Sequence, residues 1–202
     1  MTRLAKRQYH SRPYHRYFKD YAEKQVIEPD GKLRIERIYV GRYYARKLSP
    51  RQRLLRKVLY AVLYLAACAV FLHAAVENVA VNRTWFVVVP STLSLLALFW
   101  LLVPMFFYMT APKEMIVRTY KDSSGNLIRL SLITAILLSV TAVTAVVQTF
   151  VAEGGIELSA LVVAGQYIAA SAILFCLCWL EKTQPYEILP PTNKRPEKSV
   201  VI

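Results

Sequence analysis

Residues 85–109 read WFVVVPSTLSLLALFWLLVPMFFYM and contain no charged side chain. As a helix that rises about 1.5 Å per residue, this stretch is longer than the roughly 30 Å hydrocarbon core of a bilayer. Lipid offers the backbone no hydrogen-bond partners, so a chain that crosses it must satisfy its own N–H and C=O groups. The stretch therefore predicts a transmembrane helix.

Three further apolar runs of 22 or 23 residues fill the rest of the central region, at 58–80, 130–151 and 158–180. A soluble core of this size would show amphipathic periods in place of unbroken apolar runs. The connections 81–84 and 152–157 are long enough only to reverse the chain. We therefore predict an all-α integral membrane protein, a four-transmembrane-helix bundle made of two antiparallel helical hairpins.

Basic residues are distributed very unevenly between the two sides of this topology. The segments 1–57, 111–129 and 181–202 carry 25 of the 26 Lys and Arg residues, whereas the other two connections carry only Arg83. Connections rich in Lys and Arg stay on the cytoplasmic side of a membrane. We expect a multi-pass protein of the cytoplasmic membrane with both termini in the cytoplasm.

The N-terminal region, residues 1–48, is expected to be a basic cytoplasmic arm. Residues 1–57 hold 17 Lys and Arg against 5 Asp and Glu. Each basic residue close to an anionic leaflet contributes about 1 kcal/mol of attraction. We expect anionic lipid headgroups as partners and no nucleic acid, because no folded recognition module accompanies the arm.

Within this arm, residues 24–40 predict a short β-hairpin. Pro29-Asp30-Gly31 is a turn signal, and the residues after it alternate between apolar and charged side chains. An isolated hairpin is only marginally stable in water. We expect it to pack on the helix ends, on the connection 113–129 or on a partner protein.

Ser49-Pro50-Arg51-Gln52 predicts the start of the first helix. Ser49 can cap the helix, proline suits the first helical position, and Gln52 stands where a capping box needs it. We expect this helix to continue without a break as far as Asn82. The basic residues of its first two turns are expected to face lipid headgroups: Arg51, Arg53, Arg56 and Lys57.

The membrane domain spans residues 49–180 in this scheme, and its central cytoplasmic connection is 111–129. Pro112 is expected to end the second helix, and Ser123-Ser124-Gly125-Asn126 is expected to form a turn before the third. Met115-Ile116-Val117 between them either lies at the surface or pairs with the predicted hairpin. The tail, residues 181–202, is proline-rich and expected to be extended.

Glu77 is the single acidic residue inside an expected span, and His73 precedes it by one helical turn. Ionisable groups within a membrane are costly and suggest function. With Gln148 and Gln166 at the same level, the pair could form an ion or proton site. In the alternative interpretation, Glu77 lies at the outer headgroups and reaches water, and His73 is hydrogen-bonded to a neighbouring helix.

Small residues recur at helical spacing in the last span: Gly165, Ala169, Ala172 and Cys176. Small residues allow two helix backbones to approach closely. The stripe predicts a tight helix–helix contact, either inside the bundle or between two chains.

No pattern in the chain predicts catalysis, a cofactor or a metal centre. Nucleotide-binding loops, Ser/His/Asp sets and histidine-rich clusters are missing from the sequence. We therefore expect a non-enzymatic accessory or scaffold protein that binds anionic lipid and a protein partner through its basic N-terminal region. The alternative is a small dimeric transporter or channel subunit for a cation or a proton-coupled solute. A lipid-modifying enzyme is the third and weakest hypothesis.

Overall fold

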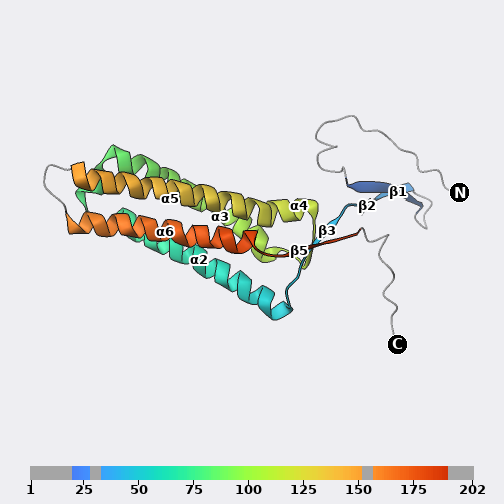
Figure 1. Ribbon diagram of the computed structural model, residues 1–202. Helices are drawn as coiled ribbons and strands as arrows, with labels where there is room; N and C mark the ends of the chain where they lie inside the picture. The colour runs from blue at the N-terminus through green and yellow to red at the C-terminus, as the bar shows by residue number, and fades with distance from the viewer. Residues whose placement is uncertain (1–19, 28–32, 152–156, 191–202) are drawn as a thin grey trace.

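The computed structural model describes residues 20–27, 33–151 and 157–190. Four long helices run side by side, and two small sheets lie beyond one end of them (Figure 1). We call this end the sheet end, and the opposite end, where η1 (Ala80–Arg83) joins two helices, the turn end. The elements in chain order are β1 (Tyr21–Ile27), β2 (Leu33–Tyr39), β3 (Tyr43–Arg46), α2 (Pro50–Val76), η1, α3 (Trp85–Thr110), β4 (Glu114–Ile116), α4 (Val117–Tyr120), η2 (Lys121–Gly125), α5 (Asn126–Val151), α6 (Leu158–Lys182) and β5 (Tyr186–Leu189).

Four helical segments are long and apolar enough to cross a membrane, which confirms the predicted four-helix membrane bundle. They are α2, α3, the continuous segment Val117–Val151 and α6. Large apolar side chains such as Val62, Trp100 and Phe106 are exposed along the outer faces. Such faces suit a lipid environment, and the chain is a multi-pass membrane protein.

The first helix starts as predicted but ends earlier. The backbone N–H of Gln52 donates to Ser49 Oγ at 3.3 Å, and the N–H of Ser49 donates to Gln52 Oε1 at 3.1 Å, which confirms the capping box. The expected continuation to Asn82 is wrong, because α2 ends at Val76. The Asn82 amide instead donates to the carbonyls of Ala74 and Glu77, at 2.8 and 3.0 Å, and so satisfies acceptors that a longer helix would have used.

The predicted turn at residues 123–126 is also wrong. Residues 121–125 form a π-helical turn, η2, within a continuous helix. The Ser123 hydroxyl donates to the carbonyl of Thr119 at 2.6 Å. Small polar residues that are common in turns can also bond back to their own helix, and Ser123 does so here.

The helices pack in the order α3, α5, α6, α2, with α5 and α6 in the closest contact. Helices α2 and α3 meet through long side chains: Tyr64 Oη donates to the carbonyl of Leu98 at 3.0 Å, and the rings of Tyr60 and Tyr108 lie 5.1 Å apart. Ser94 and Thr141 share a buried hydroxyl contact of 3.3 Å between α3 and α5. The interior of the bundle is filled by buried side chains, including Phe71, Leu101, Leu138, Tyr167 and Leu174.

A three-stranded antiparallel sheet, which the prediction of an all-α fold did not include, lies at the sheet end in the order β4-β3-β5. Tyr44 of the central strand pairs with Met115 on one side and Ile188 on the other. The sheet therefore joins the segment before α2, the connection after α3 and the segment after α6. The predicted alternative that residues 115–117 pair with the N-terminal hairpin is wrong, because Met115 pairs with β3 instead.

The N-terminal hairpin itself is confirmed by the antiparallel pairing of β1 with β2, from Tyr21 opposite Tyr39 to Ile27 opposite Leu33. Its predicted turn at residues 29–31 lies outside the described residues. The hydroxyl of Tyr39 accepts a hydrogen bond of 3.3 Å from the backbone N–H of Val117. The hairpin thus contacts the connection after α3, which is one of the places where it was expected to pack.

Candidate functional site

A buried carboxylate, Glu181, lies in the last turn of α6 and is 1% exposed. Its Oε1 accepts a hydrogen bond of 2.6 Å from the Tyr186 hydroxyl of β5. Because the tyrosine proton is used in this bond, the 2.7 Å contact between Tyr186 and Ser124 has the serine as donor. The chain Ser124–Tyr186–Glu181 therefore ties η2, β5 and α6 together.

A guanidinium group is buried in the same region. Arg46, at the end of β3, is 2% exposed, and its ζ carbon lies 4.0 Å from the centre of the Tyr108 ring on α3. None of its three side-chain nitrogens has a hydrogen-bond partner within the described residues, and the same holds for Glu181 Oε2 and Gln184 Nε2. A cation–π contact contributes about 0.5–2 kcal/mol. That offsets only part of the cost of burying an unpaired charge.

Two basic residues of α2 hold the ends of neighbouring helices. Arg56 Nη1 donates to the carbonyl of Leu180 at 3.2 Å and to Gln184 Oε1 at 2.7 Å. Lys57 Nζ donates to the carbonyls of Met109 and Ala111. Cations are favourable at helix C-termini, where unpaired carbonyls carry partial negative charge.

The four residues predicted to face headgroups thus divide into two pairs. Arg56 and Lys57 are half-buried and bond to α6 and α3, so headgroup contact is not the role that the structure gives them. Arg51 is exposed and Arg53 is half-buried, and for these two the prediction stays a prediction.

Aromatic rings fill the space between the sheet and the helices. Tyr44 stacks on Tyr120 with ring centroids 4.4 Å apart, and Tyr120 meets the ring of Tyr186 edge-on at 4.9 Å. Burial raises the pKa of Tyr186 above its ordinary value, the negative charge of Glu181 raises it further, and Arg46 partly opposes both. The raised pKa keeps Tyr186 protonated at neutral pH, as its hydrogen bond to Glu181 requires.

We call this group the sheet-end cluster; its members are Arg46, Arg56, Lys57, Tyr60, Tyr108, Tyr120, Ser124, Glu181, Gln184 and Tyr186. Only Arg56 and Lys57 of these were predicted as site residues. Glu181 lay one residue beyond the expected span, but the buried stripe Leu174, Leu177 and Cys178 continues directly to it. The spacing of these residues on one face of a helix was the sequence signal that could have predicted a buried Glu181. Arg46 had no comparable signal, because β3 is four residues long.

The chemistry of the sheet-end cluster is that of hydrogen bonding and charge. Among the residues that the structure describes, no three His, Cys, Asp or Glu side chains come together as a metal site. The one hydroxyl nucleophile apart from the phenols, Ser124, bonds to Tyr186. The arrangement is suited to fixing segments in place and to binding a polar group.

The predicted ion or proton site is only partly assembled, at the turn end. His73 Nδ1 lies 3.7 Å from Glu77 Oε1 and 3.3 Å from Gln166 Oε1 of α6. The side chains of His73 and Glu77 are 63% and 44% exposed. Gln148 is half-buried on α5 and makes no hydrogen bond within the described residues. The contact of His73 with Gln166 of α6 agrees with the alternative interpretation, in which Glu77 reaches water at the outer headgroups and His73 is hydrogen-bonded to a neighbouring helix.

The small-residue stripe of α6 faces outward. Gly165, Ala169, Ala172 and Cys176 are all exposed, and a Cβ atom at Gly165 would meet no atom within 4 Å. The predicted contact inside the bundle is therefore wrong, and the contact between chains stays a prediction.

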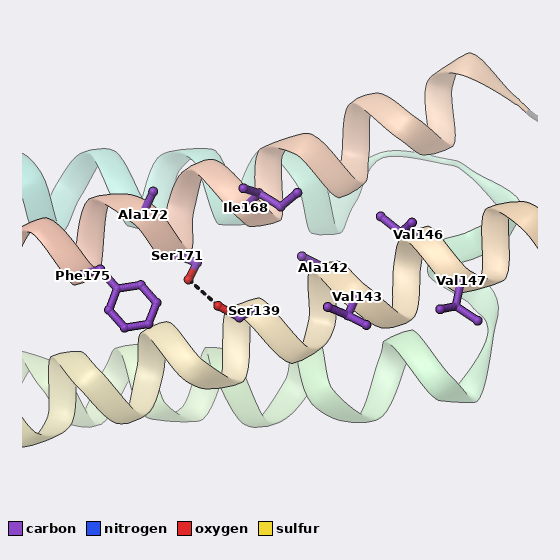
Figure 2. Close-up of a pocket in the computed structure, with 9 residues that line it drawn as sticks. All are labelled: Ser139, Ala142, Val143, Val146, Val147, Ile168, Ser171, Ala172 and Phe175. Carbon is purple, nitrogen blue, oxygen red and sulfur yellow. Dashed lines mark hydrogen bonds between the residues drawn. The ribbon is translucent and has the colours of Figure 1, made fainter.

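Ala172 also lines a lipid-facing apolar groove of about 400 Å³ between α5 and α6. Figure 2 shows the hydroxyls of Ser139 and Ser171, 2.8 Å apart, between the two helices beside this groove. One hydroxyl donates to the other, and the carbonyl of Ala135 lies 3.0 Å from Ser139 Oγ and 2.8 Å from Ser171 Oγ and accepts the remaining proton, so the pair is satisfied by the protein itself. This groove is a feature of helix packing.

The fold and the cluster together define a class: a four-helix, multi-pass membrane protein with a buried polar network beneath a small sheet. No protein-family model, no curated protein and no solved structure matches the chain.

Proposed function

We propose that this protein is a non-enzymatic accessory or scaffold protein of the cytoplasmic membrane. In this proposal the sheet end lies in the cytoplasm, and the basic N-terminal region binds anionic lipid and a protein partner. The uneven distribution of Lys and Arg supports the orientation.

One observation carries the proposal: three segments far apart in the chain form one sheet, which is clamped to the helix ends by buried side chains. Residues 43–46, 114–116 and 186–189 pair with one another. Arg46 and Tyr186 then anchor this sheet on Tyr108 and Glu181. Such a clamp fixes where the N-terminal region leaves the bundle, and a fixed position is what a scaffold surface requires.

The filled interior of the bundle supports the same view. Buried Tyr60, Phe71, Tyr167 and Leu174 occupy the space between the helices. A solute path through a single copy would have to displace these side chains.

The protein-partner part is tested on the full chain in native membranes. Replacing the six basic residues of the first nineteen by glutamine keeps the chain length and removes the charge: Arg3, Lys6, Arg7, Arg12, Arg16 and Lys19. We expect proteins that co-purify with the wild type to be lost. Replacing Lys194, Arg195 and Lys198 by glutamine is the control and should leave them. An unchanged partner set in the first variant would contradict the proposal.

A second candidate function, transport of a cation or a proton-coupled solute, is favoured by the meeting of His73, Glu77 and Gln166 on one outward surface. Since the bundle interior is filled, the path would lie between two copies of the chain, with α6 at the seam. Glu77→Gln in proteoliposomes should abolish the flux, whereas Glu187→Gln at the other end should not. Equal flux in wild type and Glu77→Gln would remove this candidate.

A further inference from the structure

The N-terminal hairpin is joined to the rest of the chain by a short connection. Strand β2 ends at Tyr39 and β3 begins at Tyr43, so residues 40–42 form the whole connection. Figure 1 shows β1 and β2 beyond β3, farther from the helices than the three-stranded sheet. Within the described residues, β1 and β2 pair with each other along their whole length and make at most isolated contacts with the other helices and strands. The position of the hairpin therefore depends on a few contacts at its base.

Tyr39 links three segments at this base. Its hydroxyl accepts a hydrogen bond of 3.3 Å from the backbone N–H of Val117 and donates one of 3.0 Å to the carbonyl of Arg42. Val117 is the first residue of α4, and the helix is continuous from there to Val151. One phenol thus connects the hairpin, the connection to β3 and the start of a membrane-spanning segment.

The ring of Tyr39 is held from both sides. It meets the rings of Tyr21 and Tyr43 edge-on, with centroids 5.2 and 5.0 Å away. Tyr21 is the strand partner of Tyr39 in the hairpin, whereas Tyr43 belongs to the three-stranded sheet. Edge-on aromatic pairs are favourable beyond the apolar area that they bury. The ring therefore adds a second link between the hairpin and the sheet.

Gly41 allows the connection to lie directly against this phenol. A Cβ atom at position 41 would lie 2.5 Å from Tyr39 Oη and 2.8 Å from Asp20 Cβ. The backbone is also fixed here, because the N–H of Val40 donates to the carbonyl of Asp20 at 2.8 Å. Glycine permits such close approach of the backbone, and any larger residue would have to displace the phenol or the base of the hairpin.

Both hydrogen bonds of Tyr39 need a protonated phenol. Burial raises the pKa of Tyr39 above its ordinary value, the N–H of Val117 lowers it, and the charge of Asp20 raises it again. The net change is an increase, so the phenol is protonated at neutral pH and can donate to Arg42 while it accepts from Val117.

We propose that residues 40–42 are a hinge, and that Tyr39 is the lock that holds the N-terminal hairpin in one orientation relative to the bundle. Hinges are a few connecting residues, often small, that absorb a change of backbone angles. When the hydrogen bonds of Tyr39 break, the two paired strands turn about the hinge as one body. The lock follows from these contacts alone. Its consequence rests on the proposed function, since it sets the direction in which the N-terminal region meets a protein partner.

The test is a distance measurement by double electron–electron resonance on the full chain in detergent. Spin labels are attached to Gln25→Cys of β1 and to Arg129→Cys, an exposed position of α5, in a chain whose three native cysteines are changed to alanine. With Tyr39 present, one narrow distance distribution is expected. Tyr39→Phe keeps the ring and removes both hydrogen bonds, so it should raise the ratio of turned to locked hairpins by about tenfold. The distribution should then broaden or split.

A second variant and two controls define the result. Gly41→Ala displaces the phenol and should broaden the distribution as Tyr39→Phe does. Tyr44→Phe is the matched control, because the ring of Tyr44 stacks on Tyr120 and its hydroxyl makes no hydrogen bond within the described residues. It should leave the distribution unchanged. Labels at Glu187→Cys of β5 and at position 129 should give a narrow distance in every variant, which separates release of the hairpin from unfolding.

Unchanged distributions in both Tyr39→Phe and Gly41→Ala would overturn the proposal, and so would equal broadening in Tyr44→Phe. Should Tyr39→Phe also broaden the distance to β5, Gly41→Ala decides alone. In native membranes, Tyr39→Phe should lower the recovery of co-purifying proteins. A released hairpin with unchanged recovery would support the hinge and contradict its link to the scaffold function. Failure of the lock and failure of the proposed function are therefore distinguishable.

Discussion

The two ends of the bundle hold polar residues in opposite ways. At the turn end His73 and Glu77 are largely exposed, and their surroundings hold short-range bonds such as Arg83 Nη2 to Asn78 Oδ1 at 2.7 Å beside single bonds that link His73 and Asn82 to α6. At the sheet end several bonds join distant segments, as in Arg56 to Gln184, and the charged groups of Arg46 and Glu181 are buried. Polar groups in a dry environment bind strongly only when they find partners. The comparison teaches that the sheet end specifies how the four helices are held together, whereas the turn end mainly reverses the chain.

The largest expected difference between the two ends concerns their carboxylates. Glu181→Ala should lower the free energy of unfolding by about 3–5 kcal/mol, because it removes the partner of Tyr186 from a buried, charged site. Glu77→Ala should cost less than about 1 kcal/mol, because its ion pair is exposed. Unfolding in mixed micelles measures both, and similar losses would refute the distinction.

A conservative change tests the hydrogen-bond chain. Tyr186→Phe should cost about 1–3 kcal/mol, since Glu181 and Ser124 lose a shared partner. The raised pKa of Tyr186 also predicts a pH effect: its contribution is complete below the ordinary value of 10.0 and is lost as the pH rises beyond it. The variant should lose less stability than wild type in that alkaline range. Tyr167→Phe, which loses a 3.3 Å bond to Asn82 at the turn end, is the comparison and should cost less.

The bracing of helix ends predicts a smaller effect. Arg56→Gln should cost about 1–2 kcal/mol, because the carbonyl of Leu180 loses a charged donor. Arg51→Gln, one turn earlier and exposed, should stay within about 0.5 kcal/mol of wild type. Thermal unfolding of the two variants side by side is sufficient, and equal midpoints would show that Arg56 does not brace α6.

The smallest effect is expected for the helix cap outside the cluster. Ser49→Ala should cost about 1 kcal/mol, as Gln52 and the first turn of α2 lose the capping box. Ser49→Asp keeps an acceptor at this position and should restore most of the loss. A full loss in both variants would mean that the hydroxyl acts through something other than the cap.

The parts of the fold that follow from local pattern could be predicted from the sequence. Unbroken apolar runs located the four helices, and Ser49 with Gln52 located the first start. The three-stranded sheet could not be predicted, because its strands come from distant segments and have only three or four residues each. Such strands are too short to show a clear alternation of apolar and polar residues. The end of α2 was misplaced because the Asn82 side chain bonds back to the carbonyls of Ala74 and Glu77, eight and five residues earlier in the chain.

The candidate site shows the same division. Glu181 was within reach of sequence analysis, since the buried period of α6 runs on to it. The burial of Arg46 depends on Tyr108 of another helix, and the inward turn of Arg56 and Lys57 depends on the carbonyls of α6 and α3. Such contacts are made by tertiary structure, and long basic side chains beside a membrane give no sequence signal of which way they turn.

The central claim is that the sheet end lies in the cytoplasm, where the sheet joins the segment before α2, the connection after α3 and the segment after α6. This claim has a direct test. Single cysteines replace Glu114, Glu187 or Asn78 in a chain whose native Cys68, Cys176 and Cys178 are changed to alanine. A membrane-impermeant maleimide should label Asn78→Cys only in intact cells, and Glu114→Cys and Glu187→Cys only in inverted vesicles. Labelling of Glu114→Cys and Glu187→Cys from opposite faces of the membrane would contradict the account.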